Sequence, residues 1–208
     1  MKVRMGIRQL LTLYVPRWRR SRPSRFFKRW RLEKIDRLTG GKLLNQEALK
    51  ILDIGCESGQ DYIRFMEGKN VQLYGVDLID KKIEQDNFTM IVADAECLPF
   101  PDKFFNFAVS MGTFEHIQPI EKLCRTVREV DRVAKSYYIT VPSISTVFEP
   151  HTGSFFWPVR SHNRKQQYEM LNYFSDEAWL QFEGFREARI MRIYYIPFFI
   201  SNTIIYKR

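Results

Sequence analysis

Cysteine and histidine are scarce in this chain. Its 208 residues include three of each, and the cysteines, Cys56, Cys97 and Cys124, form no C-x-x-C pair. An odd number of widely spaced cysteines argues against a disulfide framework and against a zinc site. The histidines also lack metal-ligand spacing. We therefore predict a protein without a metal, in a reducing, cytoplasmic compartment.

Long hydrophobic runs are absent too. A spanning helix needs about 18 uninterrupted apolar residues, and the apolar stretch at 190–205 is broken by Arg192, Pro197 and two polar side chains. The short apolar run at 10–15 is followed by Pro16 and an arginine-rich stretch, with no small-residue cleavage site. We predict neither a membrane span nor secretion.

Acidic residues are few at the N-terminal end. Residues 1–42 hold 14 Lys or Arg against two acids, Glu33 and Asp36, and so carry a charge of +12. The remaining residues hold 19 basic against 22 acidic side chains, which gives −3. This asymmetry predicts a basic arm over residues 1–42 and a single domain over residues 43–208.

The arm has features of a surface-binding element. Arginines alternate with aromatic residues from position 16 to 37, which suits an anionic membrane surface or nucleic acid. An apolar stripe at helical spacing favours peripheral membrane binding through residues 1–31 over RNA binding. A third interpretation is that the arm packs its aromatic residues on its own domain. The stripe consists of Val3, Ile7, Leu10, Leu11 and Tyr14.

The rest of the chain alternates apolar runs with helical stretches, which is typical of βαβ units. Helices are expected at 60–67 and 119–134, a stretch without regular structure at 142–174, and a helix from an N-cap at Ser175 through Phe182 to Gly184. We predict a doubly wound α/β fold with a mostly parallel, seven-stranded, Rossmann-like sheet and one antiparallel edge strand. The expected strands are 50–54, 71–76, 89–93, 104–111, 137–141, 187–195 and 199–206.

A glycine-containing turn follows the first expected strand. Residues 51–59 have the sequence ILDIGCESG, in which Gly55 and Gly59 let the backbone approach a ligand at a helix N-terminus. A dinucleotide site requires G-x-G-x-x-G, and here Glu57 and Gln60 replace the second and third glycines. Nicotinamide binding is therefore disfavoured.

Carboxylates follow the next two strands. Asp77 comes 22 residues after Gly55. An acidic side chain at this place can accept hydrogen bonds from both hydroxyls of a ribose. Asp94 ends the following strand. Because open α/β sheets bind ligands at the carboxyl ends of their strands, we expect these groups to meet at one edge.

In order and spacing, the motifs ILDIGCESG, GVD, ADAECLPFPDKFFNFAVS and FEHI resemble the class I S-adenosylmethionine-dependent methyltransferases, particularly their small-molecule branch. The likeness covers residues 51–141. It implies a turn that binds the methionine part of S-adenosylmethionine, a residue that binds its ribose, a site for its adenine and a further residue near its methionyl end. The residues that the resemblance assigns to S-adenosylmethionine are Asp53, Gly55 and Gly59 for the turn, with Glu57 in it, Asp77 for the ribose, Asp94 and the Ala95 backbone for adenine, and Met111.

Three positions depart from the family pattern. Glu57 stands where glycine is preferred; it either points outward or places a carboxylate near the cationic methionyl group. Asn106 replaces a common aspartate, and no Pro-Gly-Gly turn occurs between Val133 and Tyr137. We interpret the last two as drift in surface turns.

Methyl transfer from a sulfonium depends mainly on positioning, and a base is needed only for a weakly acidic acceptor such as a hydroxyl. Candidates after the fourth strand are Glu115 and His116, where the histidine can equally well have a structural role. Glu149 and His151, in the expected irregular segment, are further catalytic candidates.

The acceptor is constrained by what is missing. No Asn-Pro-Pro-Tyr or Asp-Pro-Pro-Tyr run and no Pro-Cys pair occurs, which disfavours common nucleic-acid base methylation. Phe155, Phe156 and Trp157, near Arg160 and Arg164, suit an acceptor with apolar and anionic parts, although core packing explains the two phenylalanines equally well. We predict a small-molecule methyltransferase acting on a hydroxyl of a glycan or lipid-linked precursor. The alternatives are an RNA methyltransferase and a non-catalytic protein that retains the fold.

Overall fold

The structure, a computed structural model, describes most of the domain and little of the arm. The predicted basic arm, apart from Glu33, Asp36 and Arg37, and the helix predicted at 60–67 lie outside the described residues. The structure describes residues 33, 36–37, 49–56, 70–80, 86–149, 154–156, 171–196 and 200–208.

The described elements alternate strands with short helices and one longer helix, α5. Within this part of the chain no helix is long and apolar enough to cross a membrane. In chain order the elements are β1 (Leu49–Ile54), β2 (Val71–Asp77), β3 (Phe88–Val92), β4 (Phe105–Met111), η1 (Phe114–His116), α5 (Ile120–Val133), β5 (Ala134–Pro142), β6 (Phe148–Glu149), β7 (Ser154–Phe155), α7 (Asp176–Trp179), η3 (Glu183–Phe185), β8 (Arg189–Ile196) and β9 (Ile200–Lys207).

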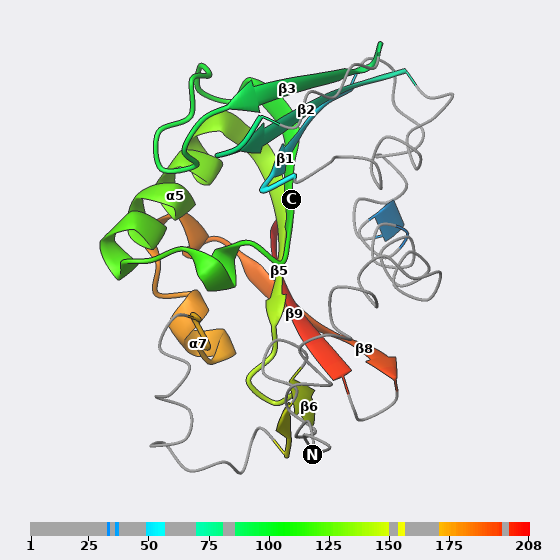
Figure 1. The fold of residues 1–208 in the computed structure, drawn as a ribbon, viewed down its shortest axis with the longest axis vertical. Helices are drawn as coiled ribbons and strands as arrows, with labels where there is room; N and C mark the ends of the chain where they lie inside the picture. Colours follow the sequence, from blue (N-terminus) through cyan, green and yellow to red (C-terminus); the bar gives the residue numbers. More distant parts are fainter. Residues whose placement is uncertain are drawn as a thin grey trace, which may run out of the picture.

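Seven strands form one sheet in the order β3-β2-β1-β4-β5-β9-β8 (Figure 1). Strands β1 to β5 are mutually parallel. Strand β9 runs antiparallel to both of its neighbours, β5 and the outermost strand β8. The predicted mostly parallel, seven-stranded sheet with antiparallel pairing at one edge is confirmed; the antiparallel strand, β9, is the second strand from that edge. All seven predicted strand segments form, with their ends within three residues of the expected positions.

The strand order reverses at β1, which has β2 on one side and β4 on the other. In a doubly wound sheet, ligands bind beyond the carboxyl ends of the strands at such a switch point. The turn containing Gly55 follows β1, and the turn containing Gly112 follows β4. The fold therefore brings these two turns to the same edge of the sheet.

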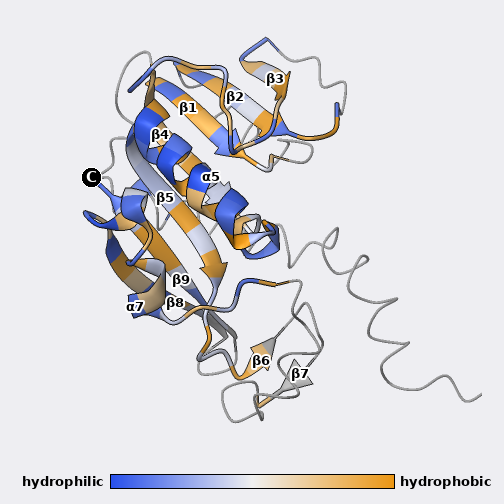
Figure 2. Cartoon of the chain, turned by 90° about the vertical axis from the view of Figure 1, so that its left-hand side faces the viewer, coloured by the Kyte–Doolittle hydropathy of each residue, from blue (hydrophilic) through white to orange (hydrophobic). Residues whose placement is uncertain are grey.

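Helix α5 packs across the sheet and buries one side of itself. Leu123, Val127 and Val130 are completely buried and belong to the larger hydrophobic core, together with β1, β4 and β5 residues. Figure 2 shows hydrophobic strands behind this helix, whose outward side is mostly hydrophilic. This amphipathic division is what holds a surface helix on a sheet. A second apolar cluster, including Ile51 and Tyr138, forms separately from the first.

The helix predicted to run from Ser175 to Gly184 is shorter than expected. Ser175 does cap it, since its Oγ accepts the Ala178 N–H at 3.2 Å, but α7 ends at Trp179. A 3-10 turn, η3, follows, in which a Cβ on Gly184 would collide with the Val127 carbonyl of α5. Close approach to α5, together with the burial of Trp179 and Phe185, outweighs the local preference for a longer helix.

Residues 142–174 were expected to lack regular structure, and this expectation is wrong in one place. Strands β6 and β7 form a small antiparallel pair, in which Phe148 is opposite Phe155 and Glu149 is opposite Ser154. A strand of two residues is too short to show the alternating pattern by which a strand is recognised in a sequence.

The two departures interpreted as surface drift have structural consequences instead. Asn106 lies inside β4, and its Oδ1 accepts the Lys50 N–H at 3.0 Å across to β1. No separate turn joins α5 to β5, since one ends at Val133 and the other begins at the next residue. Lys103, with a left-handed backbone (φ 53°), donates its Nζ to the carbonyls of Asp131 and Ala134 at this junction. A lysine thus satisfies carbonyls at the end of α5.

Candidate functional site

The turn after β1 requires glycine at position 55. Gly55 has φ +70°, and a Cβ there would collide with the side chain of Thr113. Its N–H donates to the Val76 carbonyl at 2.8 Å, which ties the turn to the end of β2. Only glycine satisfies both the backbone angle and the close approach.

Two hydroxyls from the end of β4 lock the same turn. Ser110 Oγ donates to the Ile54 carbonyl at 2.9 Å, and Thr113 Oγ1 donates to the same oxygen at 3.3 Å. Neither residue was predicted as part of the site. Their signal in the sequence was a hydroxyl residue near the end of one apolar strand and a second one just after it, while a glycine follows the neighbouring strand.

Asp53 and Asp77 occupy different environments. The Asp53 side chain is buried within β1, at 2% exposure. Asp77 ends β2 and is half-buried; its Oδ1 accepts the Ile79 N–H at 3.4 Å, and its carbonyl accepts the Ala93 N–H at 3.1 Å. Asp77 is therefore the carboxylate of the two that can meet a ligand beyond the sheet edge.

Asp94 follows β3 and is joined to both its own turn and α5. Its Oδ1 accepts the Glu96 N–H at 3.3 Å, and its Oδ2 pairs with the Nζ of Lys122. Burial acts to raise the pKa of this carboxyl, but the hydrogen bonds from Lys122 and the backbone outweigh it and lower the pKa overall. The group is ionised at neutral pH, as an acceptor for an amine requires.

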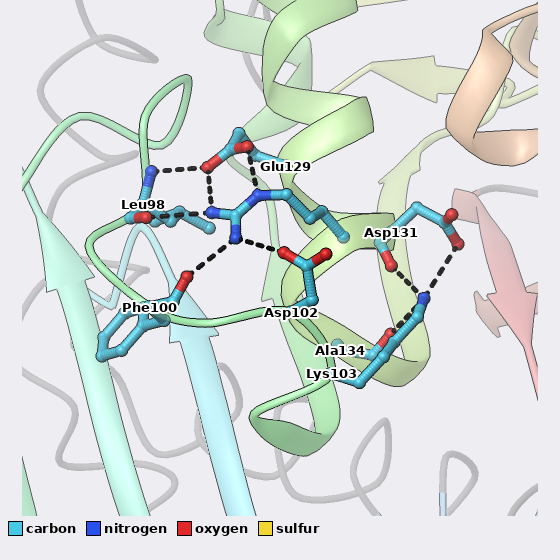
Figure 3. Close-up of polar contacts among 8 residues, drawn as sticks. Leu98, Phe100, Asp102, Lys103, Glu129, Asp131 and Ala134 are labelled. Atoms are coloured by element: carbon cyan, nitrogen blue, oxygen red, sulfur yellow. Dashed lines mark hydrogen bonds and ion pairs between the residues drawn. The ribbon is translucent and has the colours of Figure 1, made fainter.

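The loop after Asp94 is fixed by two residues of α5 that sequence analysis did not identify (Figure 3). Arg132 donates to the carbonyls of Leu98 (3.1 Å) and Phe100 (2.8 Å) and to the Asp102 carboxylate (2.8 Å). Glu129 pairs with Arg132 and accepts the Leu98 N–H at 2.7 Å. The Arg132 hydrogen bond holds the pKa of Glu129 below its ordinary value, and Glu129 in turn raises the pKa of Arg132.

The turn after β4 carries the candidate catalytic groups. Met111 ends the strand, and Gly112 (φ +80°) donates its N–H to the Thr140 carbonyl at 3.2 Å. In η1, Glu115 is 1% exposed, with its Oε1 3.4 Å from where a Cβ on Gly112 would lie. His116 is exposed. Of these two neighbours, His116 is the one accessible from solution.

Asn172 holds this turn from a distant part of the chain. Its N–H donates to the Glu115 carbonyl at 2.7 Å, and its side-chain amide donates to the carbonyls of Phe114 (2.9 Å) and Ile117 (2.8 Å). Its Oδ1 accepts from Gln118 at 2.6 Å. All of its polar groups except the backbone carbonyl serve the segment 114–118.

The other predicted site residues are only partly placed. Glu57, Gly59 and His151 lie outside the described residues. Glu149 lies in β6, paired with β7, and Ala95 is half-buried beside Asp94. The described part of the chain thus brings six of the predicted residues to strand ends or strands of one sheet: Asp53, Gly55, Asp77, Asp94, Ala95 and Met111.

The aromatic segment is only partly described. Phe156, which follows β7, is 67% exposed with a left-handed backbone (φ 57°). Core packing, the alternative considered for this residue, is therefore wrong. Trp157 lies outside the described residues.

Comparison with known proteins agrees with this geometry. Residues 52–137 match the family model described as "Methyltransferase domain". This part of the chain is therefore similar to methyltransferase domains. The predicted resemblance to S-adenosylmethionine-dependent methyltransferases is thereby confirmed.

Individual relatives are distant. The chain is 28% identical over 123 residues to 27-O-demethylrifamycin SV methyltransferase of Amycolatopsis mediterranei, and the match covers 52% of this chain and 45% of that protein. The chain spans less than half the length of the curated relatives it matches.

Solved structures share the fold. An S-adenosylmethionine-dependent methyltransferase from Methanosarcina mazei has a TM-score of 0.53 at 18% identity, covering 77% of this chain and 92% of that one. Geranyl diphosphate C-methyltransferase from Streptomyces coelicolor, solved with S-adenosyl-L-homocysteine, has a TM-score of 0.56 at 13% identity, covering 85% and 80%.

Proposed function

We propose that this chain transfers the methyl group of S-adenosylmethionine to a hydroxyl of a small molecule, a glycan or a lipid-linked precursor. The observation that carries the proposal is the convergence of the Gly55 turn, Asp77 and Asp94 at the carboxyl ends of three adjacent strands. Open α/β sheets bind nucleoside-containing ligands at the edge formed by the carboxyl ends of their strands.

The residues present fit this cofactor. The N–H of Gly55 donates to the Val76 carbonyl at 2.8 Å and so places the turn after β1 beside the end of β2, where Asp77 lies. We assign the ribose hydroxyls to Asp77, the adenine amine to Asp94 with the Ala95 backbone, and the methionyl portion to the Gly55 turn with Met111 nearby. Glu57 and Gly59 complete that turn in the sequence.

When bound, S-adenosylmethionine supplies an electrophilic methyl group on a sulfonium. The domain has to place an acceptor oxygen in line with this group, because positioning provides much of the rate. A hydroxyl acceptor would have to lose its proton in this transfer, and a base on this chain would accept it. We assign this role to His116, the exposed member of η1, with Glu149 and His151 as further candidates.

The names of two similar proteins support this class of acceptor. The relative from Amycolatopsis is named for methylation at an oxygen of rifamycin SV. The structural neighbour from Streptomyces is named as a C-methyltransferase of geranyl diphosphate, which joins an apolar chain to an anionic group. Its name supports a small acceptor that has both parts, and it does not bear on transfer to oxygen. The exposed Phe156 is consistent with an acceptor that has an apolar part.

The basic arm gives the proposal a location. Residues 1–42 carry +12 and an apolar stripe, and such a segment binds anionic membranes through charge and buried apolar surface together. We therefore place the protein in the cytoplasm, peripherally on the inner face of the membrane through residues 1–31.

The arm is tested by deleting residues 1–31 and measuring co-sedimentation with phosphatidylserine vesicles and with RNA. Lost vesicle binding supports the membrane location. Unchanged vesicle binding contradicts it, and RNA affinity that resides in the arm and falls steeply with salt would favour an RNA methyltransferase instead.

The cofactor is tested by calorimetric titration of the full chain with S-adenosylhomocysteine, comparing wild type with Asp77→Ala. We expect binding by the wild type and a loss of at least about tenfold in the variant, as for a missing charge-assisted hydrogen bond pair. A folded wild type that binds neither this product nor S-adenosylmethionine would favour the non-catalytic alternative.

A further inference from the structure

Helix α5 sends a row of charged side chains to the loop that follows β3. Lys122 pairs with Asp94, Arg125 pairs with Glu96 at 2.7 Å, and Arg132 pairs with Asp102 at 2.8 Å. The spacing of three and seven residues places them along one side of the helix. These contacts raise the question of whether each one only anchors the loop.

Loop anchoring does not depend on Lys122. Arg132 and Glu129 together hold the backbone of Leu98 and Phe100 through three hydrogen bonds of 2.7 to 3.1 Å, and they also bond to each other at 2.8 Å. Arg125 adds a contact to Glu96, within the same turn as Asp94. The loop therefore keeps its anchors when Lys122 is removed.

Lys122 instead pairs with a carboxylate, Asp94, at the edge of the sheet where the carboxyl ends of the strands lie. Asp94 lies directly beyond β3, and Ala93 beside it is bonded to the Asp77 carbonyl at 3.1 Å. The Asp94 side chain is 33% exposed and that of Lys122 24%. A carboxylate has about four lone-pair sites. The Glu96 N–H and the Lys122 ammonium use one on each oxygen, and the Ala95 N–H also donates to this carboxylate. At least one lone-pair site remains for a ligand.

We propose that Lys122 is a positioning residue for the adenine of the cofactor: by pairing with Asp94 it fixes the carboxylate in the orientation that accepts the exocyclic amine. This inference rests on the proposed function, which assigns Asp94 to adenine. The ammonium of Lys122 and the Glu96 N–H hold the carboxylate from two sides, so that its rotation is restricted before the ligand arrives. Pre-organisation of this kind raises affinity because less freedom is lost on binding.

The charge state of Asp94 is consistent with this role. Hydrogen bonding by Lys122 helps to lower the pKa of the carboxyl against the effect of burial. An ionised carboxylate accepts an amine hydrogen more strongly than a neutral acid does.

The test compares S-adenosylhomocysteine binding, by calorimetry of the full chain, among wild type, Lys122→Met, Lys122→Arg and Asp94→Asn. Arg125→Met is the matched control, because it removes the neighbouring ion pair between the same helix and the same loop. We expect Kd to rise about tenfold in Lys122→Met and to stay within about threefold of wild type in Lys122→Arg and Arg125→Met. Asp94→Asn should weaken binding at least as much as Lys122→Met. Thermal unfolding should show similar Tm values for the two methionine variants, since exposed ion pairs contribute little stability.

The outcomes separate this inference from the proposal beneath it. If Asp94→Asn weakens binding and Lys122→Met does not, the positioning role is wrong and the assignment of Asp94 stands. If Arg125→Met loses as much affinity as Lys122→Met, loop anchoring explains both and the inference is overturned. If Asp94→Asn binds like wild type, or the wild type does not bind, the adenine assignment fails and the inference fails with it.

Discussion

Asn172 donates its backbone N–H to the carbonyl of Glu115 over 2.7 Å, although the two residues lie far apart in the sequence. The same asparagine donates its amide to the carbonyls of Phe114 and Ile117, and it is 4% exposed. The turn after β4, which carries the candidate base His116, is therefore held by a residue that lies shortly before α7 in the sequence.

Asn172→Ala should destabilise the domain. The change removes three side-chain hydrogen bonds and leaves buried carbonyls with fewer donors, which costs about 2–3 kcal/mol and lowers Tm by about 5–10 °C. The measurement is thermal unfolding by circular dichroism. Asn202→Ala on β9 is the control, because the described part of the chain shows no hydrogen bond to the Asn202 side chain. Equal losses of Tm in the two variants would contradict a special role for the hydrogen bonds of Asn172.

Arg132→Lys should also lower Tm, although it keeps the charge. A lysine cannot reproduce the planar fork that reaches Glu129, Asp102 and two loop carbonyls at once. We expect a loss of about 2 kcal/mol and, because the loop follows Asp94, weaker S-adenosylhomocysteine binding. The control is Arg128→Lys, whose pair with Glu183 at 3.6 Å is largely exposed and should contribute little. Wild-type stability and affinity in Arg132→Lys would show that the fork is not required.

The strand segments and the edge of the sheet that binds the ligand followed from local patterns. Buried parallel strands appear as short apolar runs, and β1 and β4 are almost fully buried. The glycine turn and the two carboxylates were visible because each comes directly after such a run. Local patterns could not predict which side chains hydrogen-bond to the turns of the site, because residues such as Asn172 and Arg132 reach those turns only when distant segments fold together.

The C-terminal end of α5 illustrates the same limit. Its junction with β5 was expected to hold a drifted surface turn, and instead the helix passes directly into the strand. Lys103, which precedes Asp131 by 28 residues and Ala134 by 31, supplies the hydrogen bonds to their carbonyls. A long-range side-chain bond to backbone carbonyls leaves no mark in local composition.

Gly55→Ala and Gly112→Ala should differ although both glycines have positive φ. At Gly55 the added Cβ would meet the Thr113 side chain, whereas at Gly112 the nearest atom, Glu115 Oε1, is 3.4 Å away. Gly112→Ala should therefore suffer only backbone strain of about 1 kcal/mol and keep its affinity for S-adenosylhomocysteine. Gly55→Ala should lose at least about tenfold in affinity because the turn must shift. Calorimetry on the two variants decides this, and equal affinities would show that the collision with Thr113 is relieved without moving the turn.

Glu129 makes stability depend on pH in a defined direction. Its pKa in the folded state is held below the ordinary 4.5, by Arg132 first and against the effect of burial. A lowered folded-state pKa gives stabilisation that is complete above the unfolded-state pKa and is lost as pH falls through the folded-state value. Wild type should therefore be more stable than Glu129→Gln by a constant amount from pH 7 to pH 5, and the difference should shrink only below about pH 4.5. Tm measured from pH 7 to pH 3 tests this, with Glu183→Gln, at an exposed position, expected to stay close to wild type throughout. A difference between wild type and Glu129→Gln that persists undiminished to pH 3 would mean that the carboxylate charge is not what holds the loop.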